Sequence, residues 1–342
     1  MHATLQSLRL TDGVMNNQHI KRLKTGRFLK FLLGPGLFAW MVYSGKLNLH
    51  QVFGGFSHWQ AISAMIVLLC IQPGITAWRW NLLLRAQEIR LPYRQALGLT
   101  MIGLFFNVVI PGAVGGDLVK GYYITRAMEG RRSSAATSIL MDRVLGVLGL
   151  LLLAALMIVP NFSELAKNPA TRKLGVAVVG GLIVGMGFVL SAGLMGSRVL
   201  NWTLLPRVVR NVLRSLPGYH KKAAVIPVAI AVSVFSHLLS CIAYYIALRS
   251  IGGTADVSVG YFFLLVPLGL VATAIPISPA GIGVGQAAFF ALFHIVSGSH
   301  AVMAADAFTV FQLAVILVSL GGFCWYLPYR DVKVRAAVPS AY

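Results

Sequence analysis

Two stretches of the chain decide its fold: residues 96–117, ALGLTMIGLFFNVVIPGAVGGD, and residues 258–283, SVGYFFLLVPLGLVATAIPISPAGIG. Each begins as an apolar run of helical length and ends in prolines and glycines, which remove an amide donor or free the backbone and so stop a helix. A second, shorter helical stretch follows each break. Because broken backbone is tolerated at membrane depth only where protein or water covers it, we predict two re-entrant hairpins that line a cavity.

The rest of the chain consists largely of longer apolar runs. Of its 342 residues, 57% are hydrophobic and 11% are charged, whereas a soluble domain carries about 25% charged residues. We therefore predict an all-α polytopic membrane helix bundle with about six full spans, forming one domain at residues 28–327 between a basic tail (1–27) and a C-terminal tail (328–342). Six runs approach or exceed the roughly 20 residues that cross a bilayer: Phe28–Tyr43, Trp59–Ala77, Ser134–Val159, Leu174–Leu194, Ala223–Leu248 and Val302–Leu327.

The net charge of +20, with 29 Lys and Arg residues, would suggest nucleic-acid binding in a soluble protein. Here the basic residues lie mainly between apolar runs, so we expect no nucleic-acid partner. If both hairpins return to the side from which they enter, and residues 79–95 form a loop, 23 of the 29 lie on one side of the membrane. Basic loops mark the cytoplasm, so we expect an inner-membrane protein with both termini in the cytoplasm.

This topology predicts an inverted repeat. Residues 59–159 and 223–327 each contain a long run, a broken hairpin and a second long run, and the run at 174–194 connects the two halves. Interrupted helices at matching places in two inverted halves indicate a transporter binding site. We therefore expect the substrate between the two hairpins.

Few acidic residues are available, and charge inside a bilayer costs about 2.5–3.5 kcal/mol per residue on insertion scales. Asp117 follows the first break, and Asp142 and Arg143 lie inside a 26-residue apolar run. We expect Asp142 to pair with Arg143, with a basic residue of the first hairpin such as Lys120, or with both. Ionisable groups at this depth usually mark a pathway, although an ion pair that only fixes helix register is the alternative.

The breaks themselves suit an anion, because a restarting helix points its positive end and unpaired amides at the gap. Near the first break, Asn107 either bonds those amides or contacts a headgroup, and Asp117 is a plausible N-cap. Near the second break the polar members are Ser278 and Gln286. The other predicted substrate-contacting residues are Pro111, Gly112, Gly115, Gly116, Tyr123, Pro276, Pro279, Gly281 and Gly283.

No sequence pattern indicates a metal site, a cofactor or a catalytic motif. The three cysteines are far apart inside apolar runs, which is typical of packing residues. His237 and His294 lack a second ligand at useful spacing. We therefore expect no cofactor, no metal, no enzymatic activity and no ATP hydrolysis by this chain.

Three motifs together resemble those of a known family: NVVIPGAVGGDLVKGYY at 107–123, SILMDRVLG at 138–146 and PISPAGIG at 276–283. The chain looks like the lysylphosphatidylglycerol synthase transmembrane, or flippase-like, family over residues 28–327. The resemblance implies re-entrant helices and a role in moving or presenting lipid headgroups, and the soluble synthase domain of bifunctional members is expected to be absent. The chain departs from the pattern at Gly285 and Gln286, where many relatives carry Arg-Glu.

These observations favour a flippase or transporter for an anionic lipid or lipid-linked headgroup. The expected partners are membrane lipids, either anionic or linked to polyprenyl or hopanoid groups. One alternative is a membrane-embedded enzyme that acts on a lipid phosphate or a lipid-linked sugar, for which Asp117 and Asp142 are the credible carboxylates. Another is a non-catalytic partner of a lipid synthase or a glycosyltransferase.

Overall fold

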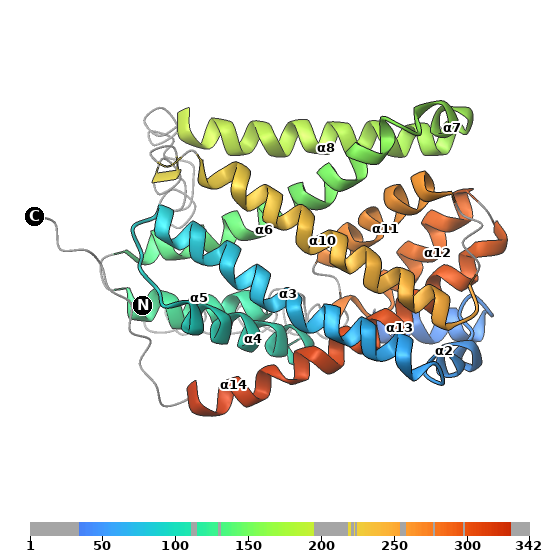
Figure 1. The fold of residues 1–342 in the computed structure, drawn as a ribbon, viewed down its shortest axis with the longest axis horizontal. Helices are drawn as coiled ribbons and strands as arrows, with labels where there is room; N and C mark the ends of the chain where they lie inside the picture. The colour runs from blue at the N-terminus through green and yellow to red at the C-terminus, as the bar shows by residue number, and fades with distance from the viewer. Residues whose placement is uncertain are drawn as a thin grey trace, which may run out of the picture.

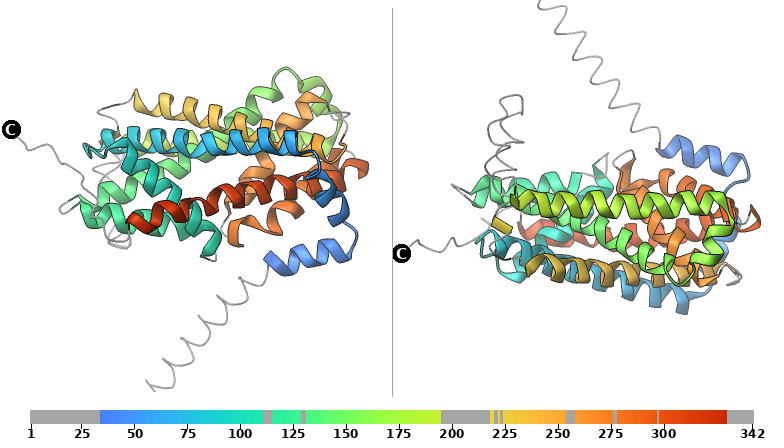
Figure 2. Two further views of the ribbon diagram at one scale, coloured as in Figure 1. Left: turned by 60° about the horizontal axis from the view of Figure 1, so that its bottom comes forward. Right: turned by 90° about the horizontal axis from the view of Figure 1, so that it is seen from above.

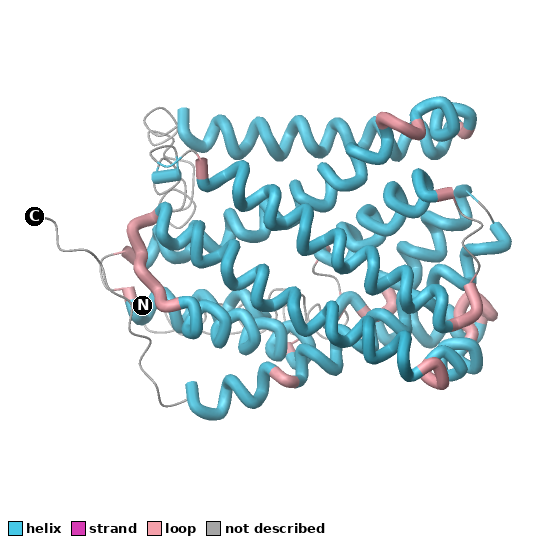
Figure 3. Tube along the Cα trace, viewed as in Figure 1, coloured by secondary structure: helices cyan, strands magenta, loops and turns pink. Residues whose placement is uncertain are grey.

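The computed structural model describes residues 34–110, 115–128, 131–194, 218–219, 222, 224–253, 258–275, 278–296 and 298–329. The regular structure of these residues is helical, and loops lie mainly at the two ends of the bundle and near the helix breaks (Figure 3). The predicted all-α membrane bundle is therefore confirmed.

Five helices are long and apolar enough to cross a membrane. They are α3 (Trp59–Ala86), α6 (Arg132–Ile158), α8 (Pro169–Leu194), α10 (Val225–Ser250) and α13 (Ala301–Leu320), and α14 (Gly322–Tyr329) extends α13. They confirm five of the six predicted spans. The predicted first span begins outside the described residues, of which 34–43 are helical.

The two broken hairpins are present and lie in opposite ends of the bundle. In the first, α4 (Tyr93–Val109) ends at Ile110, whose backbone is extended, and α5 (Gly115–Ala127) returns beside α4. In the second, α11 (Val259–Ala274) ends at extended Ile275, and the 3-10 turn η3 (Pro279–Gly281) leads into α12 (Val284–Val296). The η3 turn packs against α4. The turn that follows the second break therefore lies against the helix that precedes the first break, inside the bundle (Figures 1 and 2).

The order of long helix, hairpin and long helix occurs twice with opposite direction. Helix α3 runs toward the end of the bundle that holds the first hairpin, and α6 runs away from it; α10 runs toward the second hairpin, and α13 runs away from it (Figure 1). Helix α10 packs on both α3 and α6. This close packing needs small residues, since a Cβ on Gly149 would lie 2.5 Å from the Cβ of Ser233.

The outer surface of the bundle is apolar. Helix α8 lies along one edge (Figure 1) and exposes Val176, Ile183 and Val184, whose exposed fractions are 68%, 66% and 73%. Such a surface suits lipid tails and not water. The short helices α2 (Leu49–Gly55) and α7 (Phe162–Lys167) and the turn η4 (Gly298–His300) lie at the end of the bundle that holds the second hairpin.

Candidate functional site

Three buried charges meet where the first hairpin packs on the long helices. The Nε atom of Arg79 on α3 donates to Oδ1 of Asp142 on α6 at 2.9 Å. The Nζ atom of Lys120 on α5 lies 4.0 Å from the other carboxylate oxygen of Asp142. The three residues are only 6%, 8% and 5% exposed, in the order Arg79, Asp142, Lys120. We call them the charged cluster.

Neighbouring side chains hold the two cations in place. The Nη1 atom of Arg79 donates to the hydroxyl of Ser233 on α10 at 2.7 Å. The ammonium of Lys120 lies 3.7 Å from the ring centroid of Trp80, which is a cation–π contact. The indole N–H of Trp80 in turn donates to Ser138 at 3.1 Å. The charged cluster thus contains two cations and one carboxylate, which leaves a surplus positive charge in a buried position.

A second ion pair lies beside the charged cluster. The Nε atom of Arg143 on α6 is 2.5 Å from Oδ2 of Asp117 on α5. Of the two partners predicted for Asp142, Lys120 is the one observed; Arg143 pairs with Asp117 instead, because consecutive residues of a helix face different neighbours. The predicted N-cap role of Asp117 is wrong: it is the third residue of α5. A negative charge there is favoured by the positive end of the helix.

Asn107 and two glycines shape the first break. The backbone N–H of Gly116 donates to Oδ1 of Asn107 at 2.8 Å, so the amide-bonding role predicted for Asn107 is the one observed. A Cβ on Gly116 would collide with the carbonyl oxygen of Gly103, and a Cβ on Gly115 would lie 2.6 Å from the Cβ of Ile110. The predicted contacts Pro111 and Gly112 lie outside the described residues.

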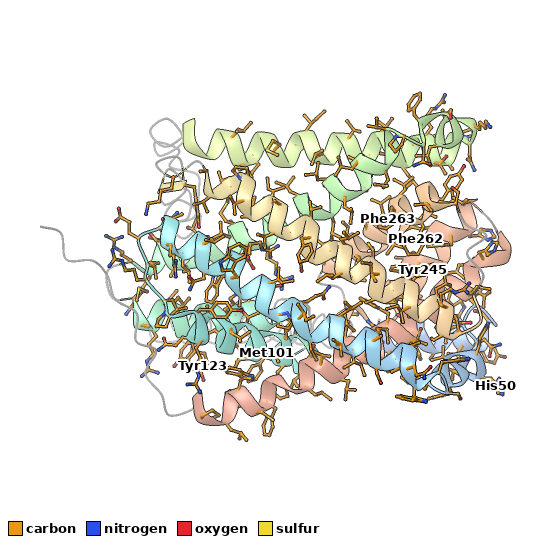
Figure 4. The ribbon with its side chains drawn as sticks, viewed as in Figure 1. His50, Met101, Tyr123, Tyr245, Phe262 and Phe263 are labelled. Carbon is orange, nitrogen blue, oxygen red and sulfur yellow. The ribbon has the colours of Figure 1, made fainter. Side chains whose placement is uncertain are left out.

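Tyr123 lies further along α5, where it packs partly buried against the hydrophobic cluster that contains Trp80. Its ring contacts that of Tyr122, with centroids 5.7 Å apart. Figure 4 shows Tyr123 at the end of the bundle that holds the first hairpin. The sequence-predicted residues Asn107, Gly115, Gly116, Asp117, Lys120, Tyr123, Asp142 and Arg143 are thus gathered on this hairpin and α6.

At the second break, uncharged side-chain amides bond one another and the backbone. Gln286 Oε1 accepts from the backbone N–H of Gly283 at 2.8 Å, and its Nε2 donates to Gln312 Oε1 at 2.7 Å. Gln312 in turn donates to the carbonyl of Ala280 at 2.8 Å. Gly281 and Gly283 have φ of +75° and +79°, a region that favours glycine.

The other predicted residues of the second break have different surroundings. Ser278 is fully buried, and its hydroxyl has no hydrogen-bond partner among the described residues. Pro279 begins η3, but its side chain lies outside the described part of the structure, as does Pro276 entirely.

A family model described as "Lysylphosphatidylglycerol synthase TM region" matches residues 27–320. The chain belongs to this family. It is also 34% identical over 85 residues to the UPF0104 membrane protein PH1989 of Pyrococcus horikoshii, a match that covers 24% of this chain and 25% of that protein. No solved structure matches the chain.

As a member of the lysylphosphatidylglycerol synthase transmembrane family, the chain is a multi-pass membrane protein with a lipid-related role. The sequence at positions 285 and 286 has a structural counterpart. A Cβ on Gly285 would collide with the ring of Phe308, so this packing leaves no room for an arginine. The partner of Gln286 is the neutral Gln312. The second hairpin of this family member is therefore held by amides at this position.

Sequence reasoning missed Arg79, which it had placed in a loop after a span ending at Ala77. Helix α3 instead continues to Ala86, which buries Arg79 and Trp80. A usable signal was available, because residues 78–86, WRWNLLLRA, contain neither proline nor glycine and stay largely apolar. Gln312 and Ser233 were missed because the sequence does not indicate which residue a single polar side chain on an apolar helix will bond.

An apolar groove of about 490 Å³ opens beside the first hairpin, between α3, α4, α13 and α14. Its volume falls within the roughly 300–1,000 Å³ of typical ligand pockets. The groove is lined by Ile66, Cys70, Pro73, Gly74, Leu97, Met101, Leu317, Val318, Gly321 and Trp325.

Among the described residues, no group of three or more His, Cys, Asp and Glu side chains could hold a metal ion.

Proposed function

We propose that this chain is an inner-membrane flippase or transporter for an anionic lipid or lipid-linked headgroup. Its family supports a lipid-related role in the membrane. The observation that carries the finer proposal is the surplus positive charge of the buried cluster of Arg79, Lys120 and Asp142. A buried cation without its own counter-ion is stabilised by an anionic ligand, and the low dielectric of the site strengthens that attraction.

Lys120 is the residue proposed to bind the headgroup. Arg79 is engaged by Asp142 and Ser233, so its guanidinium mainly orients the carboxylate. Lys120 carries three N–H donors, and its contact with Asp142 is 4.0 Å, too long for a hydrogen bond. The Trp80 ring holds the ammonium in position from one side. A phosphate oxygen would complete the coordination of this ammonium.

The charge distribution supports an entrance from the cytoplasmic leaflet. Basic loops mark the cytoplasm, and the end of the bundle with the first hairpin carries Arg85, Arg90, Arg94, Arg131 and Arg132. In this orientation both termini are cytoplasmic, and the charged cluster faces the leaflet that is rich in anionic lipid. The apolar groove beside α4 offers room for an acyl chain of the same lipid.

An enzyme of lipid phosphates is less well supported. Its general base would have to be Asp117 or Asp142, but each accepts a hydrogen bond from an arginine. An arginine therefore already occupies a carboxylate oxygen of each candidate base. The arrangement therefore supports transport by this chain better than catalysis. Lipid analysis of a deletion strain separates the two: transport predicts a normal lipid on the wrong leaflet, and an enzyme predicts a missing lipid species.

The direct test measures lipid movement in proteoliposomes with headgroup-labelled phosphatidylglycerol and a zwitterionic control lipid. Lys120→Met, which keeps the length of the side chain and removes its charge, is expected to slow movement of the anionic lipid at least about tenfold, which corresponds to about 1.4 kcal/mol. Lys173→Met is the matched control, because Lys173 is exposed on α8 at the other end of the bundle. Equal rates in wild type and Lys120→Met would remove the assignment.

A further inference from the structure

A buried carboxyl lies at the end of the bundle opposite the charged cluster. Asp306, on the first turns of α13, is fully buried. Its Oδ1 accepts from the backbone N–H of Asn48, just before α2, at 2.8 Å. Its Oδ2 is buried and has no hydrogen-bond partner among the described residues. The side chain therefore has one satisfied oxygen and one orphaned oxygen.

No cation of the described residues lies within ion-pairing distance of Asp306. Lys46 is in the same region, but its ammonium lies over the rings of Trp40 and Phe290, at 4.2 and 5.4 Å from their centroids. An ionised carboxylate that is buried without a cation is costly. Protonation removes this charge and gives the orphaned oxygen a hydrogen to donate.

Several other titratable groups on the packed elements are engaged elsewhere or exposed. Tyr244 on α10 donates its hydroxyl to the carbonyl of Ala304 at 3.0 Å. His294 on α12 stacks on Phe290, with centroids 5.8 Å apart. His50 on α2 is exposed, and His300 caps the start of α13. Asp306 is the buried acid among these groups.

Polar side chains continue from Asp306 along α13 toward the second break. Thr309 lies one turn further, and its hydroxyl is 3.4 Å from Nε2 of Gln286. Gln286 and Gln312 then reach the backbone of Gly283 and Ala280 at the break. Asp306 therefore lies on the same helix as Thr309 and Gln312, which contact Gln286 of the second hairpin.

We propose that Asp306 is a proton-binding site, occupied when the second hairpin is packed against α13 as in this structure and emptied when that hairpin moves. The alternative is a purely structural role, in which the Asp306 carboxyl accepts the N–H of Asn48 and holds that residue against α13. This role does not require Asp306 to bind or release a proton. Coupling of the proton to lipid movement rests on the proposed function, whereas proton binding itself does not.

Infrared difference spectroscopy of the reconstituted protein, between about pH 4 and about pH 9 so that the range extends from the ordinary carboxyl pKa values of about 3.9–4.3 to well above them, tests the site without any lipid assay. Wild type is expected to show the carbonyl band of a protonated, buried carboxyl, and Asp306→Asn is expected to lose it. The substitution retains an oxygen for the Asn48 amide. Glu88→Gln, which removes an exposed carboxyl paired with Arg131, is the control and should retain the band.

A second measurement follows thermal unfolding over the same pH range. Ionisation of the buried Asp306 carboxyl destabilises the fold, so wild type should lose stability as the pH rises, and Asp306→Asn should lose less. An unchanged carbonyl band together with an unchanged pH dependence in Asp306→Asn would overturn the proposal and leave Asp306 with only a structural role. Loss of both with normal lipid movement would retain the proton site and separate it from transport.

Discussion

The two hairpins share one scaffold but differ in the chemistry that they bury. Asp117 is the third residue of α5, which begins at Gly115, and it pairs with Arg143, the twelfth of α6, which begins at Arg132. Gln286 and Gln312 are likewise the third residue of α12 and the twelfth of α13. Both pairs are separated by 26 residues. The inverted repeat therefore extends to individual positions, with an ion pair in one half and an amide pair in the other.

The correspondence continues into the charged cluster. Lys120 and Asp142 are the sixth and eleventh residues of their helices, and the equivalent positions of α12 and α13 hold Phe289 and Phe311. These rings pack around Tyr244 of α10, with centroids 4.8 and 6.3 Å away. Figure 4 shows further aromatic side chains near this half, Tyr245 and Phe262, whose centroids are 5.8 Å apart. One half thus buries charge where the other packs rings, and the proposed function therefore places the anion site in one half.

The largest effect expected from this difference is at Asp142. Asp142→Ala leaves Arg79 and Lys120 buried without a carboxylate, and breaking a buried ion pair costs about 3–5 kcal/mol. Denaturant unfolding in detergent micelles measures the loss. A loss of unfolding free energy below about 1 kcal/mol would show that the charged cluster is well hydrated. It would then not be equivalent to the buried rings of Phe289 and Phe311.

A second prediction concerns the close approach at the first break. Gly116→Ala drives a Cβ into the backbone of Gly103, and overpacking of this kind costs about 1–3 kcal/mol. Gly121→Ala is the matched control on the same helix, because its Cβ would meet Ile139 at an ordinary 3.5 Å. Equal melting temperatures for the two variants would contradict the tight packing of α5 on α4.

The smallest effects separate the two equivalent pairs. Gln286→Leu leaves the N–H of Gly283 and the Oε1 atom of Gln312 without partners, which costs about 1–3 kcal/mol. Asp117→Asn removes a partly exposed pair, since the Arg143 side chain is 41% exposed, and should cost less than about 1 kcal/mol. Unfolding of both variants under one condition gives the comparison. A larger loss of stability in Asp117→Asn than in Gln286→Leu would mean that the amide network contributes less to stability than the ion pair.

Most of the fold was predictable because its signals are local. The apolar runs and the proline and glycine breaks at residues 111–116 and 276–283 determine where helices start and stop, and basic residues predicted the hairpin directions. The end of the second span was misplaced, because Arg79 was taken as a loop residue. Charge at a helix end does not show by itself whether the helix continues into a buried position.

The site was predicted only in part because its contacts join distant segments. Asp142, Lys120, Asp117 and Arg143 were chosen for the cost of charge in a membrane, but the partner of Asp142 is Arg79, 63 residues away. The amide pair was half predicted, since Gln286 was named and Gln312 was not. Pairings of this kind follow from how helices pack, which a single sequence does not state.

Native mass spectrometry of the purified protein with phosphatidylglycerol tests the central claim most directly. Wild type and Lys173→Met are expected to retain the anionic lipid in preference to phosphatidylcholine and to lysylphosphatidylglycerol, whose headgroup is cationic. Lys120→Met is expected to lose that preference. Retention of phosphatidylglycerol by Lys120→Met at the wild-type level would contradict the assignment of the buried lysine as the anion site.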